Sequence, residues 1–250
     1  MNKFEECEKA QSKIRLLDLQ GKDLSSPEAL EQYKLRNSFG LDPATEIHRI
    51  FQKDYYEKDV SDGYLTLPVA SSTIWNDPLE NPLEDVMGID PVTGGQIDYG
   101  SLVRSFYALC WTDRSDHNPK DWGSFSHGKE AIRITTTVGN LLDRLMTTSD
   151  RLYMHRTWLI GVEYKNPALI QAMKNPAVVI NHMESSGARL AASAAVVRTE
   201  FSCENEVRLL FDASTKPELT NVLYFNNKQY IRIPFDWNGF VNGTVLKFTG

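Results

Sequence analysis

The sequence predicts an α+β protein in which a helical N-terminal segment precedes a mixed or antiparallel sheet. Three observations favour this class: helical patterning over the first 37 residues, strand-like segments from residue 46 onward, and the separation of those segments by loops and helices. We expect two parts, a helical segment over residues 1–40 and an α+β domain over residues 41–250. A chain of 250 residues suits one large domain with an appended segment.

The N-terminal helices are indicated by apolar spacing and by a start signal. The stretch FEECEKAQSKIRLLDLQ places apolar residues on one helical face, and Ser25-Ser26-Pro27-Glu28 is typical of the start of a second helix. Gly40 and Pro43 end that helix. We expect the two helices to be separable from the sheet, so that a truncated chain still folds. An insoluble truncation would show instead that the helices complete the core.

Strands are expected where β-branched and aromatic residues cluster. In chain order they are EIHRIFQ (46–52), YLTLPVASS (64–72), the apolar run 106–111, AIRITTTV (131–138), TWLIGVEYK (157–165), ENEVRLLFD (204–212), QYIRIPFDW (229–237) and TVLKF (244–248). Between them we expect a polar link at 54–63, loops at 73–85 and 91–100, and helices at 139–154, 166–175 and 180–201.

Composition excludes several classes of function. The net charge is −6, which argues against a sequence-independent grip on nucleic acid. The apolar runs are too short for a membrane span, and the polar start MNKFEECEKAQ is unlike a secretory signal. The three cysteines, Cys7, Cys110 and Cys203, lie far apart and indicate neither a disulfide framework nor a zinc site. We therefore expect a cytoplasmic protein.

Sequence motifs for metal or nucleotide chemistry are absent. There is no Gly-rich phosphate loop, no G-x-S-x-G and no H-E-x-x-H in the sequence. His117, His127, His155 and His182 show no metal-ligand spacing among themselves. We expect no metal cofactor.

Five short blocks, in order, resemble a widespread bacterial domain family with the pattern F-N-D-P-F-E, C-F-S, M-W, Y, G-V-x-I and E-x-E-x-R-L. The five matching stretches here are HRIF, WNDPLE, ALCWT, WGSFSHGKEAIRI and ENEVRL. The resemblance covers roughly residues 46–235. The chain departs from the pattern at Trp75, at Trp111-Thr112 and at Phe125. That family has no settled activity to carry over.

The same blocks are similar, at greater distance, to the ADP-ribosyltransferase superfamily. Its arginine–serine–glutamate class has an Arg on a first strand, a Ser or Thr on a second, and E-x-E before a later strand. Arg49, Thr112 and Glu204-x-Glu206 match these landmarks in order. The resemblance implies an ADP-ribosyltransferase-like sheet that uses NAD as substrate. It also implies a macromolecular acceptor, and a toxin, phage product or defence effector as the biological setting.

The two glutamates would carry the chemistry that the resemblance implies. Positive charge develops on the ribose as nicotinamide leaves, so Glu206 would stabilise that charge and hold the ribose 2′-hydroxyl. Glu204 would orient the acceptor or remove its proton. Alternation in a strand puts both carboxylates on one side. The alternative is that both are solvated residues at a strand start, with Arg208 as partner. In either case we expect that replacing each by glutamine leaves the protein folded, because an exposed carboxylate contributes little stability.

The first-strand ligand is Arg49 or His48. Arg49 would clamp the pyrophosphate of NAD bidentately, and we prefer it because E-x-E belongs to the arginine class. In the histidine–tyrosine–glutamate class, His48 would contact the ribose and Tyr55, Tyr56 or Tyr64 would stack on the ligand. The alternatives are a surface arginine and a structural histidine.

The remaining candidate residues would support the cofactor. Thr112 would hold the first strand and Glu206 in place, and Trp111 and Trp122 would stack on nicotinamide or adenine. Asn76, in the turn Asn76-Asp77-Pro78, would lie on the rim of the site. The alternative interpretations are that Thr112 only ends a strand, that Trp111 and Trp122 are core residues, and that Asn76 belongs to a simple turn.

Three functions remain open at this point. The first is NAD-dependent ADP-ribosyl transfer, and the second is NAD hydrolysis with water as acceptor. The third is a non-catalytic interaction module that uses the same cleft, in which Glu204 and Glu206 are solvated and no nucleotide binds.

Overall fold

The structure is a computed structural model that describes residues 3–116, 125–126, 128–146, 155–183, 186–214, 221–225, 228–241 and 246–248. The N-terminal half contains α1 Lys3–Leu19, α2 Pro27–Asn37, β1 Glu46–Gln52, α3 Lys53–Asp62, β2 Tyr64–Pro68, α4 Ser72–Trp75, β3 Met87–Ile89, β4 Gln96–Asp98, η1 Tyr99–Leu102 and β5 Phe106–Thr112. The C-terminal half contains β6 Ala131–Thr137, α6 Val138–Met146, β7 Thr157–Gly161, β8 Glu163–Lys165, α8 Pro167–Met173, α9 Pro176–Val179, η2 Ile180–His182, α10 Ala188–Ser193, β9 Val196–Arg198, η3 Thr199–Glu204, β10 Glu206–Asp212, β11 Asn221–Phe225, β12 Lys228–Pro234 and β13 Leu246–Phe248. The α+β class expected from the sequence is confirmed.

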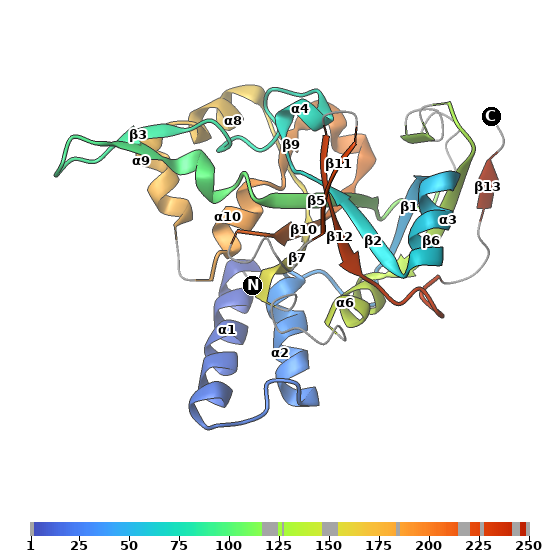
Figure 1. Cartoon of the computed structure of the whole chain (residues 1–250). Helices are drawn as coiled ribbons and strands as arrows, with labels where there is room; N and C mark the ends of the chain where they lie inside the picture. Colours follow the sequence, from blue (N-terminus) through green and yellow to red (C-terminus); the bar gives the residue numbers. More distant parts are fainter. Residues whose placement is uncertain are drawn as a thin grey trace.

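A six-stranded sheet forms the centre of the molecule (Figure 1), in the order β13-β6-β1-β5-β10-β7. Every pairing in it is antiparallel. The ladder between β5 and β10 runs from Glu206↔Thr112 to Asp212↔Phe106, whereas β1 and β5 share the single pair His48↔Thr112. β1 is therefore held mainly by β6 on its other side, and it separates from β5 beyond that one pair.

Three smaller sheets accompany the central one. The largest has the order β11-β12-β2 and is antiparallel, and Val69 at the end of β2 forms a bridge to Tyr107 of β5. β3 and β4 form a two-stranded hairpin that extends away from the body of the molecule (Figure 1). β8 and β9 form a short parallel pair close to the start of β10.

Two apolar cores cover the two faces of the central sheet. Alternate residues of a strand point to opposite faces, so β10 contributes Val207 and Leu209 to one core and Leu210 to the other. The first core also contains residues of α1, α2, α6, β2 and β12. The second contains residues of α10 and of the segment between β2 and β5. Burying a leucine side chain fully contributes about 1.5–3 kcal/mol, so the apolar residues strongly favour the observed assignment of side chains to the two faces.

Helices α1 and α2 form a hairpin that projects below the sheet in Figure 1. The side chain of Ser26 accepts a hydrogen bond from the Ala29 N–H, which caps α2 as the sequence predicts. Ile14, Leu17 and Tyr33 are buried in the first core. These contacts favour the alternative in which the N-terminal helices complete the core of the sheet domain.

Several segments differ from the expected elements. The loop expected at 91–100 contains β4 and the start of η1, and the strand expected at 64–72 ends at Pro68. The polar link expected at 54–63 is the helix α3, which ends at Gly63 with a φ of 72°. This left-handed position suits glycine and is a common way to end a helix. The Ala-rich stretch expected as one helix is divided into η2, α10, β9 and η3 in its described part, and Gly187 begins α10 with a φ of 73°. Within the described ranges, no helix combines the length and the apolar character that crossing a membrane requires.

Candidate functional site

The ends of three neighbouring strands bring three polar residues into one row. Thr112 at the end of β5 lies opposite Glu206 of β10 on one side and opposite His48 of β1 on the other. Residues that face each other in an antiparallel ladder point their side chains to the same face. The row His48, Thr112, Glu206 therefore lies on one face of the sheet, and it unites residues that are far apart in the chain.

Glu206 is fixed through both its backbone and its side chain. Its N–H donates to the Tyr164 hydroxyl at 2.8 Å, and its carbonyl accepts from the Val162 N–H at 2.9 Å. Its carboxylate accepts from Arg208 Nε at 2.6 Å and from Arg208 Nη2 at 3.0 Å. Only 7% of the residue is exposed. The alternative of a solvated edge carboxylate is therefore wrong for Glu206, and β10 is an interior strand.

Glu204 does not share the strand geometry of Glu206. It is the last residue of η3, and Asn205 has a φ of 43° and a ψ of 54°. This left-handed residue interrupts the alternation that would put both carboxylates on one side of an extended chain. Glu204 instead presents its carbonyl to the Thr112 hydroxyl, which donates to it at 2.6 Å. Thr112 thus links β5 to the turn before β10, close to its expected holding role.

Arg208 is the centre of a buried ionic network. Besides Glu206, its Nη1 donates to Glu80 at 3.0 Å and to the Ala194 carbonyl, at the end of α10, at 2.8 Å. The Trp75 ring lies 4.4 Å from its guanidinium carbon. Burial acts to lower the pKa of Arg208, but the Glu206 and Glu80 carboxylates outweigh burial and raise it. The guanidinium therefore stays charged, with two carboxyl groups beside it.

Glu80 and Cys110 complete the surroundings of this network. Burial raises the pKa of the Glu80 carboxyl, although Arg208 acts in the opposite direction. Cys110 lies opposite Arg208 in the β5–β10 ladder. Burial, followed by the nearby Glu206 charge, raises the pKa of the Cys110 thiol, so the thiol is protonated and unsuited to nucleophilic attack.

Arg49 points to the face opposite Glu206. It follows His48 by one residue, lies opposite the core residue Ile134, and its guanidinium carbon is 4.8 Å from the Phe51 ring centre. Its Nη1 donates to the Cys110 carbonyl, which faces the opening between β1 and β5. Burial lowers the pKa of Arg49 to about 10, so it remains a cation at neutral pH. The structure does not bring Arg49 together with Thr112 and Glu206 on one face, as the expected pyrophosphate clamp requires.

His48 is the first-strand residue that shares the face of Glu206. It is 4% exposed, and its Nδ1 lies 2.8 Å from the Thr135 hydroxyl on β6. The tyrosines considered as its stacking partners lie elsewhere. Tyr56 packs against Phe51 and Trp237 at the first core, and Tyr64 lies under the guanidinium of Arg232.

The two tryptophan candidates and Asn76 have different outcomes. Trp111 is 2% exposed and packs edge-on against Phe51 and Phe240, so it is a core residue of the face opposite Glu206. Trp122 lies outside the described residues. Asn76 is exposed, ends α4 with a φ of 54°, and directly follows Trp75, which covers Arg208. Asn76 therefore does lie beside the Arg208 network.

Sequence reasoning missed most of the residues that hold Glu206. Arg208 was considered only as the partner of a solvated carboxylate, and Glu80 and Tyr164 were not considered. The available signal was the E-x-R spacing, because residues two apart in a strand share a face. Arg133 was also missed. It lies on the same face, opposite Ile50, and donates to the Arg114 carbonyl at 2.9 Å.

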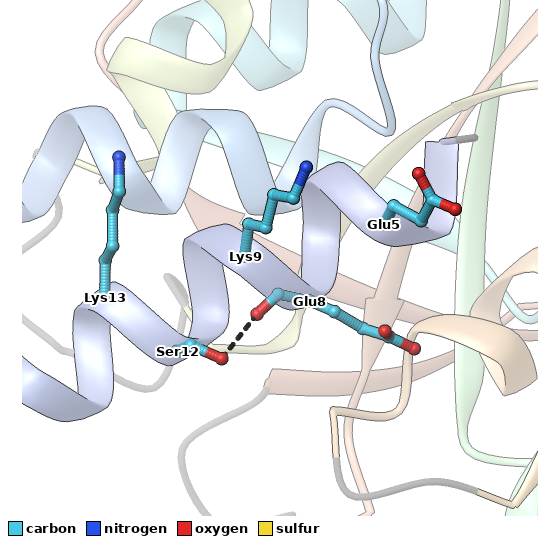
Figure 2. A pocket seen from close by; sticks show the side chains of 5 residues that line it. All are labelled: Glu5, Glu8, Lys9, Ser12 and Lys13. Carbon is cyan, nitrogen blue, oxygen red and sulfur yellow. Dashed lines mark hydrogen bonds between the residues drawn. The ribbon is translucent and has the colours of Figure 1, made fainter. Parts of the chain in front are cut away.

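A second candidate surface lies on helix α1. Figure 2 shows a shallow depression lined by Glu5, Glu8, Lys9, Ser12 and Lys13, in which the Ser12 hydroxyl donates to the Glu8 carbonyl at 2.9 Å. All five residues come from one helix face with charges of both signs, which is the usual character of a solvated surface. Across the described part of the chain, no three His, Cys, Asp or Glu side chains gather closely enough to hold a metal ion.

Comparison of the chain with protein-family models, with curated proteins and with solved structures gave no significant match. Function is therefore inferred from the geometry around Glu206.

Proposed function

We propose that the protein cleaves NAD and transfers ADP-ribose to a macromolecular acceptor, on the face where His48, Thr112 and Glu206 lie in one row. The observation that supports this proposal is the strand register, because it brings His48, Thr112 and Glu206 side by side on adjacent strands. An ADP-ribosyltransferase-like sheet is part of the proposal. His48 takes the first-strand role, since Arg49 points to the opposite face.

The charge of the site supports this chemistry. The ribose of NAD becomes positively charged as nicotinamide leaves, and fixed negative charge beside it lowers the barrier. Glu206 and Glu80 place two carboxyl groups beside the single guanidinium of Arg208, and their side chains are less than a tenth exposed. A preorganised, weakly hydrated negative group stabilises a developing cation more strongly than a solvated one does.

Two arginines lie close to Thr112, and the Arg114 guanidinium already binds the Asp116 carboxylate and the Cys203 carbonyl. Arg114 lies two residues beyond Thr112, with its backbone N–H bonded to the Thr112 hydroxyl at 3.1 Å, and Arg133 bonds to the Arg114 carbonyl. Guanidinium groups suit phosphate oxygens. In this proposal they attract the pyrophosphate of NAD, which is the role first expected of Arg49.

Glu204 is the residue proposed to serve the acceptor. It lies at the end of η3 and is half-buried, so its carboxylate is more accessible than that of Glu206. A carboxylate there would remove a proton from an incoming hydroxyl, amine or guanidinium. Glu204→Gln is then expected to suppress transfer roughly a hundredfold while sparing NAD hydrolysis, because water needs less orientation.

The experiment that tests the proposal uses the purified full chain with NAD. Binding is measured as a rise in the melting temperature, cleavage as release of nicotinamide, and transfer as labelling of protein or nucleic acid in a cell extract. Release with labelling supports ADP-ribosyl transfer, and release alone supports an NAD glycohydrolase. If neither melting temperature nor nicotinamide changes, the protein does not use NAD.

One observation favours a second candidate, a non-catalytic interaction module. Both carboxylate oxygens of Glu206 already accept hydrogen bonds from Arg208, which is the arrangement of a structural ion pair. In that case the network only fixes the ends of the strands. The NAD binding experiment separates the two candidates.

A further inference from the structure

We propose that Arg208 is a positioning residue that sets the orientation of the Glu206 carboxylate, and that the segment Trp75–Glu80 holds Arg208 in place. This inference rests on the proposed NAD cleavage. It assigns a function to the W-N-D-P-L-E block, which the sequence places on the rim of the site.

The contacts of Arg208 exclude a direct role in substrate binding. It is 1% exposed, and four hydrogen bonds occupy four of the five N–H donors of a guanidinium. Two of these bonds go to Glu206, one to Glu80 and one to the Ala194 carbonyl. A phosphate or ribose hydroxyl would therefore find a buried guanidinium that has one N–H donor left and two carboxyl groups already beside it.

The geometry of the pair determines the orientation of Glu206. The Nε and Nη2 atoms of Arg208 form two bonds to the two oxygens of one carboxylate, which fixes the plane of that carboxylate as well as its position. The Glu206 backbone is held at the same time by Tyr164 and Val162. Few degrees of freedom remain, so the directions of the remaining lone pairs of the carboxylate are fixed.

The far end of Arg208 is held by residues distant in sequence. Glu80 and the carbonyl at the end of α10 bind Nη1, and the Trp75 ring covers the guanidinium at 4.4 Å. Asp77, between these two residues, is itself fixed by Arg198 at 2.8 Å. Hydrogen bonds connect the segment to Glu206 through Arg208, and the Glu80 carboxylate also acts on Glu206 directly through its charge.

Steady-state kinetics of nicotinamide release test this role. Arg208→Lys keeps the charge but loses the two-pronged contact, so kcat is expected to fall roughly ten- to a hundredfold. KM for NAD should stay within about twofold, because Arg208 does not touch the substrate. Glu80→Gln keeps one acceptor for Nη1 but removes the charge, and it should lower kcat about threefold or more with the same unchanged KM.

Arg232→Lys is the matched control. Arg232 lies on β12 and pairs with two residues of α3, Asp59 at 3.7 Å and Asp62 at 2.8 Å, outside the site. The kcat and KM of Arg232→Lys should therefore equal those of the unchanged protein. Melting curves report the folded fraction of every variant. If Arg208→Lys does not fold, Glu80→Gln is the deciding variant.

The outcomes separate this inference from the proposed function. If the unchanged protein releases no nicotinamide, the proposed function fails and the positioning role falls with it. If the unchanged protein is active and folded Arg208→Lys and Glu80→Gln keep its kcat, only the positioning role is overturned. A rise in KM at constant kcat also overturns it, because Arg208 would then bind substrate.

Discussion

Arg208 and Glu206 lie two residues apart on β10 and form a buried, two-pronged ion pair with bonds of 2.6 and 3.0 Å. The spacing puts both side chains on one face of the strand, where Glu80 and Trp75 cover them. Breaking one partner of a buried pair leaves the other charge without compensation. Changes at Glu206 are therefore expected to affect stability, in contrast to the small effect that an exposed carboxylate predicts.

The first prediction concerns the pH dependence that Glu80 gives to stability. Burial raises the pKa of the Glu80 carboxyl above the ordinary value of 4.5, so the folded chain binds more protons than the unfolded chain just above that value. The free energy of unfolding then falls as pH rises through this window. Glu80→Gln removes that fall. The difference between the melting temperatures of Glu80→Gln and the unchanged protein (variant minus unchanged) should therefore be larger at pH 7 than at pH 4.5. Scanning calorimetry measures both temperatures.

Asp90→Asn is the control of opposite sign. The Thr93 hydroxyl and the Val92 N–H bind the Asp90 carboxylate and lower its pKa. A lowered pKa gives stability that is present at neutral pH and lost as pH falls through the folded value. The deficit of Asp90→Asn should therefore be larger at pH 7 than at pH 3. The same trend with pH in both variants would contradict the assigned environment of Glu80.

The second prediction compares two leucines on helix α1. Leu17 is 7% exposed and belongs to the first core, whereas Leu19 on the same helix is 85% exposed. Leu17→Ala should lower the free energy of unfolding by about 2–4 kcal/mol, because it leaves a cavity. Leu19→Ala should change it by about 0.5 kcal/mol or less. Urea unfolding of both variants measures the difference, and equal values would show that the hairpin does not share the core.

The third prediction extends this result to deletion of residues 1–37. The deletion removes Ile14, Leu17 and Tyr33 from the first core, and His155 loses its contact of 3.0 Å with the Tyr33 hydroxyl. Because one face of the sheet is then exposed, we expect the truncated chain to show no cooperative unfolding transition. Circular dichroism on heating measures this transition. A truncated chain that melts cooperatively near the temperature of the full chain would show that the helices are a separate unit.

The fourth prediction distinguishes Arg49 from His48. Arg49→Gln removes a cation that serves the Cys110 carbonyl on the opposite face, so it should cost about 1–3 kcal/mol of stability and leave NAD turnover per folded molecule unchanged. His48→Gln should lower turnover roughly tenfold or more, because His48 shares the row with Glu206. Turnover divided by the folded fraction is the measurement. A loss of turnover confined to Arg49→Gln would restore the arginine-class assignment.

Local patterns were sufficient to predict many of the elements. Strands 46–52, 106–112, 131–137 and 206–212 correspond to β-rich runs, and Ser26-Pro27 marks the start of α2. The helix α3 was missed because it is polar on most of its surface, so apolar spacing gives little signal. Its evidence in the sequence is Gly63, which ends it in the left-handed conformation.

The site was harder to predict because it depends on register and on one backbone angle. Nothing local specifies that Thr112 lies between His48 and Glu206, since antiparallel pairing joins strands that are distant in the chain. The E-x-E pattern suggested two equivalent carboxylates, but the left-handed Asn205 separates them. The E-x-R spacing indicates the pairing of Glu206 with Arg208, but only the folded chain reveals that Glu80 joins them.

The measurement that tests the central claim most directly is nicotinamide release by Glu206→Gln beside Asp59→Asn. Both variants replace a buried carboxylate by an amide. Asp59, however, lies on α3, and its carboxylate accepts from the Thr66 hydroxyl at 2.6 Å and from the Thr66 N–H at 2.9 Å. Both should lose stability, by about 1–3 kcal/mol. Per folded molecule, Glu206→Gln should release nicotinamide roughly a hundredfold more slowly than the unchanged protein, and Asp59→Asn at the unchanged rate. Equal rates for all three proteins, or no release by any of them, would contradict NAD cleavage at Glu206.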